Sequence, residues 1–142
     1  MNADPELVFI DMNVLVYAYD RSAGKKQAIA AGLIEQCWED MNGCLSIQVL
    51  QEFHVVVSGK ITPPLDHLVA RQIVADLSRW RLHLPDASDL LQAIDLARQL
   101  RLSFWDAMIL QSALRLGCRR ILTEDLSNGQ TYGSLQVINP FL

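Results

Sequence analysis

The sequence lacks any apolar run long enough to cross a membrane. A membrane-spanning helix needs about 20 predominantly apolar residues, and no uninterrupted apolar stretch of this 142-residue chain approaches that length. The first residues, MNADPELVF, also lack the basic start and long apolar segment of a secretory signal. We therefore expect a soluble, cytoplasmic protein with no membrane partner.

Cysteine and histidine are scarce, and neither is arranged as a known site. The three cysteines, Cys37, Cys44 and Cys118, form an odd set without a C-x-x-C pair, and the three histidines show no ligand spacing. These absences argue against a disulfide framework and against a zinc site. We expect the cysteines to be small core residues in a reducing compartment.

Basic charge is also in short supply. The chain has 12 Lys and Arg against 16 Asp and Glu, a formal net charge of −4, whereas nucleic-acid-binding domains are usually basic. Taken alone, the charge argues against such a partner. The apolar fraction of 51% and charged fraction of 20% exclude a disordered chain. Length and composition predict a single domain over residues 1–142.

Short apolar runs alternate along the chain with segments of helical periodicity. This alternation predicts parallel βα units, and so a three-layer α/β/α domain with a mainly parallel sheet. Prolines 63 and 64 suit a helix N-terminus, and Phe104 and Trp105 are expected to pack their helix against the core. The predicted strands are 7–10, 43–47, 81–85, 120–122 and 135–140, and the predicted helices are 25–41, 47–59, 62–80, 87–100 and 103–118.

Two acids follow predicted strands directly or after a short loop. Asp11 comes after the first strand, and Asp125 comes after the strand 120–122. In open parallel sheets, ligands bind beyond the carboxyl ends of the strands. We therefore expect both carboxylates to emerge at the same edge of the sheet.

Four acids stand in apolar surroundings: Asp11 in VFIDMNV, Glu52 in VLQEFHV, Asp106 in SFWDAMI and Asp125 in ILTEDLS. Each has a structural explanation. Asp11 could cap the following helix, and Glu52 could face solvent. Asp106 occupies the capping-box position relative to Ser103, and Asp125 could form a turn.

Considered together, the four acids indicate a cation site. Two negative charges 4 Å apart repel by about 4 kcal/mol at an effective dielectric of 20, so a cluster of four is tolerable when cations neutralise it. Oxygen ligands without histidine or cysteine favour a hard ion, Mg²⁺ or Mn²⁺. Asn13 and Thr123 are neutral groups suited to orienting a carboxylate or a water molecule.

The same segments carry a family resemblance. FIDMNVLVYAYD, LSIQVLQEF, LSFWDAMIL and ILTEDLSNGQ, closing with VINPF, resemble the successive motifs of the PIN domain. The likeness is greatest to the small VapC-like ribonuclease toxins of bacterial toxin–antitoxin pairs. It spans nearly the whole chain, with the motifs in the family's order. It implies a five-stranded, mainly parallel sheet between helices.

The resemblance also implies an activity and a site. It implies an endoribonuclease that leaves a 5′ phosphate and binds one or two Mg²⁺ or Mn²⁺ ions. The same four acids would be the catalytic and metal-binding residues, with Asn13 and Thr123 in support. Because Glu124 stands beside Asp125, the sequence leaves open which of the two points into the site.

The charge objection weakens once the acids belong to a metal site, because the chain without them is electrically neutral. Arg21, Lys25 and Lys26 closely follow the first motif and are candidates for contacts with RNA phosphates. The expected partners are an RNA substrate, an antitoxin protein and a second copy of the chain in a homodimer. Apolar residues in the region 46–75 could form a partner surface.

Other readings remain open. A haloacid-dehalogenase-like phosphatase would have a second aspartate two places after the first acid, where this chain has Asn13. A receiver domain would need adjacent acids at the first strand and a lysine near the last strand, and VINPF has none. The third alternative is a catalytically weak PIN-like module that binds RNA or protein. Such modules usually lack one or more of the acids, and this chain keeps all four.

Overall fold

The structure is a computed structural model that describes residues 5–142, and residues 1–4 of the predicted domain 1–142 lie outside the described residues. Its centre is a six-stranded sheet in the order β3-β2-β1-β4-β6-β5. The strands are β1 Val8–Ile10, β2 Gly43–Ser46, β3 Arg81–His83, β4 Arg120–Leu122, β5 Thr131–Tyr132 and β6 Leu135–Ile138.

The sheet is mainly parallel, as predicted, but it has one strand more than the five expected. Five strands run parallel, and β5 pairs antiparallel with β6. Gly133, with a φ of 61°, lies in the two-residue turn that joins them. Because β5 has only two residues, it carries too little alternation for a sequence pattern to detect.

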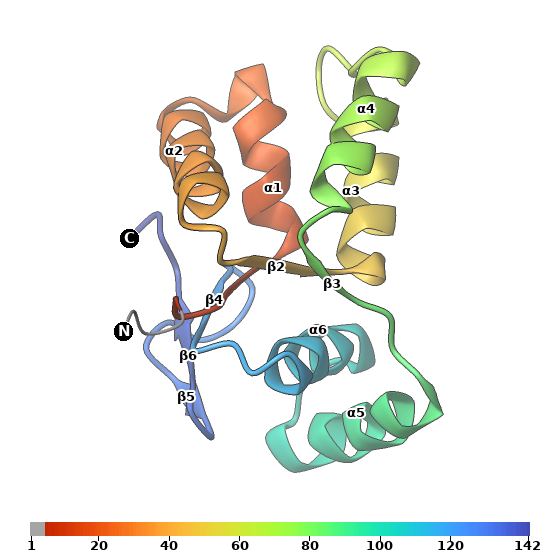
Figure 1. Cartoon of the computed structure of the whole chain (residues 1–142), viewed down its shortest axis with the longest axis vertical. Helices are drawn as coiled ribbons and strands as arrows, with labels where there is room; N and C mark the ends of the chain where they lie inside the picture. The colour runs from red at the N-terminus through yellow and green to blue at the C-terminus, as the bar shows by residue number, and fades with distance from the viewer. Residues whose placement is uncertain (1–4) are drawn as a thin grey trace.

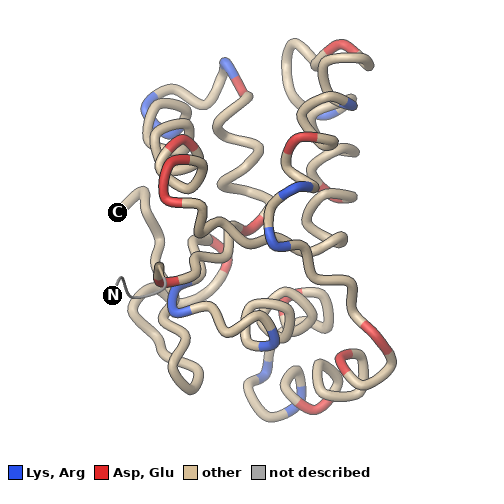
Figure 2. The backbone as a smooth tube through the Cα atoms, in the orientation of Figure 1, with Lys and Arg blue, Asp and Glu red and all other residues tan. Residues whose placement is uncertain are grey.

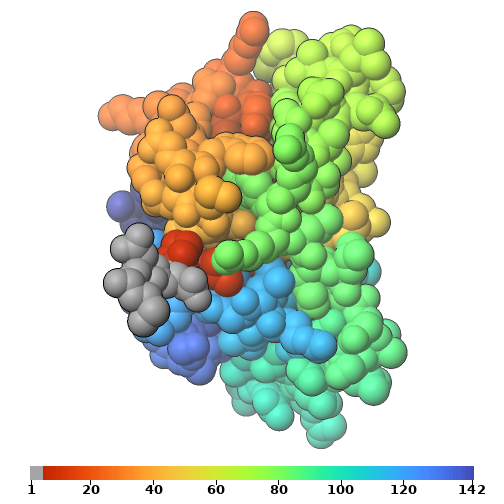
Figure 3. Space-filling model, in the orientation of Figure 1, coloured from red at the N-terminus to blue at the C-terminus, as the bar shows by residue number. Residues whose placement is uncertain are grey.

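Helices cover both faces of the sheet, which confirms the predicted three-layer α/β/α architecture. In Figure 1, α1 to α4 lie on one side of the sheet and α5 and α6 on the other. The space-filling view shows the same division, with α5 and α6 in the lower part of the molecule (Figure 3). The helices are α1 Met12–Tyr19, α2 Lys25–Asp40, α3 Ile47–Gly59, α4 His67–Leu77, α5 Ala87–Leu100 and α6 Phe104–Arg115, with the 3₁₀ turn η1 Arg21–Ala23.

Side-chain caps mark the starts of all the α-helices except α2, which begins after Gly24 without one. The predicted ranges 47–59 and 87–100 agree with α3 and α5. The predicted start of α4 at the prolines is wrong, since the helix begins at His67, where Asp66 accepts a hydrogen bond from the backbone N–H of Leu68 at 3.1 Å. A proline disfavours helical backbone in the residue before it, and the first side-chain cap comes only at Asp66.

The core lies on the strands and on the helix faces against them. Phe9, Ile10 and Ile121 are fully or almost fully buried, because both faces of a parallel sheet are covered. Burying a side chain of this size contributes about 1.5–3 kcal/mol. The three cysteines are buried and free, as predicted.

The expectation that Trp105 packs against the core is wrong. Its side chain is 63% exposed, and its ring meets Phe104 edge-on at a centroid distance of 4.9 Å. Phe104 itself packs against a small cluster between α5 and α6. Within residues 5–142, every helix is too short or too polar to span a bilayer.

Candidate active site

Asp11 is a buried carboxylate at the carboxyl end of β1. Its backbone is extended, and its Oδ1 accepts a hydrogen bond from the N–H of Met12 at 2.7 Å, which caps α1. Its Oδ2 accepts from the hydroxyl of Thr123 at 2.8 Å. Only 6% of the residue is exposed. Asp11 therefore caps a helix and also lies in the site, two roles that the sequence presented as alternatives.

Thr123 connects Asp11 to the end of β4. β1 and β4 are parallel neighbours with Ile10 opposite Leu122, so the residues after each strand emerge side by side. The fully buried Thr123 Oγ1 donates to Asp11 and accepts from the backbone N–H of Asp125 at 3.1 Å. One hydroxyl therefore joins the two acid-bearing segments, at the sheet edge that the sequence predicts.

Asn13 joins the same group from the first turn of α1. Its Nδ2 donates to Asp125 Oδ2 at 2.9 Å and lies 3.5 Å from Thr123 Oγ1. Its Oδ1 is buried and has no hydrogen-bond partner among the described residues. A buried carbonyl oxygen without a partner is uncommon in folded proteins. This oxygen is therefore an acceptor left free beside Asp125.

The electrostatic environment of Asp11 opposes its ionisation. The pKa of Asp11 is raised from 3.8 to about 6, chiefly by burial, and the negative charges of Asp125 and Glu52 contribute to this rise. The hydrogen bonds from Thr123 and Met12 act in the opposite direction. Asp125 and Glu52 therefore both lie close enough to Asp11 for their charges to act on it.

Glu52 reaches this region from α3. The helix is capped by Ser46, whose hydroxyl accepts from the N–H of Val49 at 3.3 Å. One turn before Glu52, the Nε2 of Gln48 donates to Glu52 Oε1 at 2.9 Å. The sequence analysis missed Gln48. Its spacing, four residues before an acid on a helix, is the signal that could have found it.

Asp106 belongs to the first turn of α6. Its backbone N–H donates to the hydroxyl of the cap residue Ser103 at 3.1 Å. The carbonyl of the preceding residue, Trp105, lies 3.4 Å from the Nε2 of Gln48. Gln48 thus contacts both Glu52 and the turn that contains Asp106.

Glu124 points away from the other acids, toward α1 and α2. Its carboxylate accepts from the hydroxyl of Tyr17 and forms an ion pair with Lys26 Nζ at 2.9 Å. Burial acts to raise the pKa of Glu124, but Tyr17 and Lys26 outweigh it and hold this pKa below its usual value. Asp125 is the member of the pair that faces Asn13.

The three candidate RNA-binding cations do not share one environment. Lys26 has Glu124 as a partner, and its ammonium lies over the Tyr17 ring at 4.8 Å from the centroid. Arg21 and Lys25 are exposed beyond the far end of α1 from Asp11, a helix of eight residues and so about 12 Å long. Lys and Arg are spread over several elements rather than gathered on one face (Figure 2).

The oxygens of the four acids do not converge on a point. Within residues 5–142, no three His, Cys, Asp or Glu side chains are close enough together to hold an ion as they stand. Glu52 and Asp125 instead accept hydrogen bonds from the amides of Gln48 and Asn13. One oxygen of each of these two carboxylates is therefore oriented by a neutral donor.

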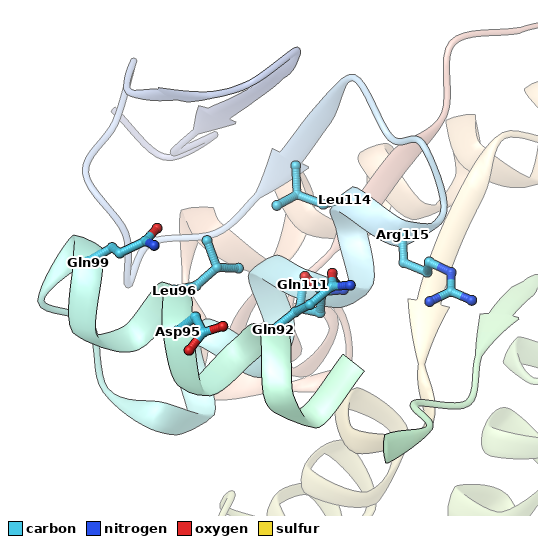
Figure 4. A pocket seen from close by; sticks show the side chains of 7 residues that line it. All are labelled: Gln92, Asp95, Leu96, Gln99, Gln111, Leu114 and Arg115. Atoms are coloured by element: carbon cyan, nitrogen blue, oxygen red, sulfur yellow. Dashed lines mark hydrogen bonds between the residues drawn. The ribbon is translucent and has the colours of Figure 1, made fainter. Parts of the chain in front are cut away.

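Two cavities differ in their relation to the acids. A groove of about 460 Å³ between α5 and α6 contains none of the four (Figure 4). A second cavity of about 310 Å³ borders the site, since Met12 and Glu52 line it together with Gln51, Val55, Val56 and Lys60. The second cavity is the one continuous with the candidate site.

Comparison with known families decides the classification. A model of the PIN domain matches residues 8–127. The chain belongs to the PIN domain family. This confirms the resemblance that the sequence motifs indicate, and the matched range includes Asp11, Glu52, Asp106 and Asp125. No match was found among curated protein sequences.

Solved PIN-like structures share the fold at low sequence identity. VapC20 of Mycobacterium tuberculosis, described as a sarcin–ricin loop cleaving toxin, is 19% identical over 83% of this chain and 91% of its own, with a TM-score of 0.61. A toxin–antitoxin complex from Klebsiella pneumoniae is 16% identical over 94% of this chain and 97% of its own, with a TM-score of 0.67. VapBC-1 of nontypeable Haemophilus influenzae is 17% identical over 96% of this chain and 99% of its own, with a TM-score of 0.64.

Proposed function

We propose that this PIN domain is a divalent-metal-dependent endoribonuclease and the toxin of a toxin–antitoxin pair. The observation that carries the proposal is the buried carboxylate of Asp11. It is linked through Thr123 to the segment of Asp125, and its pKa is raised chiefly by burial and also by the charges of Asp125 and Glu52. Burying an acid beside other acids is unfavourable unless a cation binds there.

The residues present fit a hard divalent cation. The donor set consists of carboxylates and the buried, unpartnered Oδ1 of Asn13, and oxygen ligands are those that Mg²⁺ and Mn²⁺ prefer. Asp11, Asp106 and Asp125 would hold one or two ions, and Glu52 would help hold an ion or position a water molecule. A bound dication lowers the pKa of water to near neutrality and offsets negative charge developing on a phosphate.

The chain's own residues keep the acids ready for this role. Met12 and Thr123 each donate to one oxygen of Asp11, which fixes the carboxylate and favours its charged form. Asn13 fixes Asp125 in the same way. Such supporting hydrogen bonds typically change metal affinity or activity 10–100-fold when they are removed.

The solved structures with this fold support RNA and an antitoxin as the partners. One is described as a toxin that cleaves the sarcin–ricin loop, and another is described as a toxin–antitoxin complex. We extend these partners to this chain, with Arg21, Lys25 and Lys26 as contacts for RNA phosphates and a homodimer as the assembly. The protein would act in the cytoplasm, where its RNA substrate is found.

The decisive experiment is cleavage of total RNA by the purified protein with Mg²⁺ or Mn²⁺. We expect 5′-phosphate products from the wild type, no cleavage in EDTA, and a loss of at least about 100-fold in Asp11→Asn. Asp20→Asn is a matched control, because Asp20 caps η1 and asparagine also caps well. Wild-type rates in Asp11→Asn would remove Asp11 from the mechanism.

The chemistry of residue 13 bears on one alternative function, and an RNA-binding assay tests the other. A dehalogenase-like phosphatase needs an acid at position 13, but Asn13 donates a hydrogen bond to Asp125, which an ionised aspartate cannot do. A binding module would retain RNA in a gel-shift assay without producing cuts. That outcome would replace the nuclease proposal.

A further inference from the structure

Gln48 connects two helices that carry acids of the site. Its Nε2 donates to Glu52 Oε1 at 2.9 Å, within α3, and to the carbonyl of Trp105 at 3.4 Å, in the first turn of α6. Among residues 5–142, this is the only hydrogen bond that joins α3 directly to α6. Figure 1 shows these helices on opposite sides of the sheet.

The chemistry of the two acceptors fixes the orientation of the amide. An ionised carboxylate and a backbone carbonyl can only accept hydrogen bonds, so the nitrogen of Gln48, and not its oxygen, must face them. Both hydrogens of the amide are then used, one on each helix. The bond to Glu52 is partly buried, whereas the longer bond to the Trp105 carbonyl is exposed to solvent.

Glu52 requires such support more than an isolated surface acid does. It lies close enough to Asp11 for its charge to disfavour the ionisation of that carboxylate, and like charges push flexible side chains apart. A glutamate also loses rotamer freedom when it is held in one position. Gln48 limits both effects at Glu52, and it ties the turn that contains Asp106 to α3.

We propose that Gln48 is a positioning residue of the site: its amide holds Glu52 and the start of α6 in fixed relation, so that the carboxylates of Glu52 and Asp106 meet the dication together. The inference rests on the proposed function. Gln48 would contact neither the RNA nor the scissile phosphate. Its effect would be on dication affinity and turnover and not on substrate binding.

Two substitutions test the inference. Gln48→Met keeps the length of the side chain and removes both donors, while Gln48→Glu keeps the shape and adds a charge that repels Glu52. Gln36→Met is the matched control, because Gln36 donates to Asp40 at 2.9 Å with the same four-residue spacing on α2, away from the site. Circular dichroism and Tm identify any variant that fails to fold.

The first measurement is Mn²⁺ affinity by calorimetry without RNA, and the second is kcat and KM for RNA cleavage. We expect both Gln48 variants to bind Mn²⁺ about 10–100-fold more weakly, with a similar loss in kcat. KM and Tm should stay close to those of the wild type, and Gln36→Met should match the wild type throughout.

The possible failures are distinguishable. If the wild type binds Mn²⁺ and cuts RNA while Gln48→Met does both equally well, the positioning role is wrong and the proposed function stands. If only Gln48→Glu is impaired, the effect is one of added charge, and the positioning role is again wrong. If the wild type neither binds Mn²⁺ nor cuts RNA, the proposed function fails and the role of Gln48 fails with it.

Discussion

The carboxylate of Asp11 is held where burial and neighbouring negative charge oppose its ionisation. Its pKa is raised to about 6, so the folded chain binds this proton more tightly than the unfolded chain does. The contribution of Asp11 to stability therefore falls as the pH rises from about 4 to 6, and it is most unfavourable above that window. Acids that destabilise a fold in this way are often found at functional sites.

Asp11→Asn should therefore gain stability relative to the wild type as the pH rises, when no divalent ion is present. The difference between the usual pKa of 3.8 and about 6 corresponds to about 3 kcal/mol. We expect the difference in unfolding free energy between variant and wild type to change by about that amount between pH 3.5 and pH 7, as measured by urea denaturation in EDTA. A difference that is constant with pH would contradict the account.

At the level of secondary-structure elements, a buried polar cluster attaches α5 to β3 and α6. The carboxylate of Asp89, 1% exposed, accepts hydrogen bonds from the N–H of Asp86 at 3.0 Å and from Gln111 at 3.1 Å. It also pairs with His83 at 3.1 Å and Arg115 at 3.2 Å. Burial acts to raise the pKa of Asp89, but the Asp86 N–H, Gln111 and His83 outweigh it and lower the pKa to about 2.

Asp89→Asn should destabilise the fold by about 1.5–3 kcal/mol at pH 7, because it removes the charged acceptor of hydrogen bonds from the Asp86 N–H, Gln111 and Arg115. A lowered pKa adds stability above its usual value of 3.8, and this contribution is lost as the pH falls toward about 2. The gap between wild type and variant in urea denaturation should therefore narrow in acid. Asp95→Asn, at an exposed acid of the same helix, serves as control, and equal stabilities of Asp89→Asn and wild type at pH 7 would refute the prediction.

The sequence could predict most elements because their signals are local. Ser46 starts α3 and Asp86 starts α5, and both are residue types that favour caps. Contacts between distant segments carry no local signal. The role of Asp89 depends on residues 22 and 26 positions later, and the choice between Glu124 and Asp125 depends on where Tyr17 and Lys26 lie.

The sequence names the four acids, Asn13 and Thr123 as candidates, but it gives no sign of the contact between Gln48 and Trp105. Parallel topology places the residues after β1 and β4 at one edge, so Asp11 and Asp125 follow from the strand order. The link from Gln48 to Trp105 joins residues 57 positions apart on different helices. Such a link becomes visible only once the helices are packed.

Across the whole molecule, the strand order itself creates the site. β2 and β3 lie on one side of β1, and β4 and β6 lie on the other. The chain connections therefore diverge between β1 and β4, which opens a crevice at the carboxyl ends of these two strands. Asp11 follows β1 and Asp125 follows the loop after β4, so the acids lie where this class of sheet binds its ligands.

The central claim is that these acids together hold a divalent cation, and anomalous diffraction from a crystal soaked in Mn²⁺ tests it most directly. We predict an anomalous peak bordered by oxygens of Asp11, Asp106 and Asp125, with Glu52 turned toward it, and no such peak in Asp11→Asn. A saturated wild-type crystal with no peak among these residues, or with its only peak elsewhere, would contradict the account.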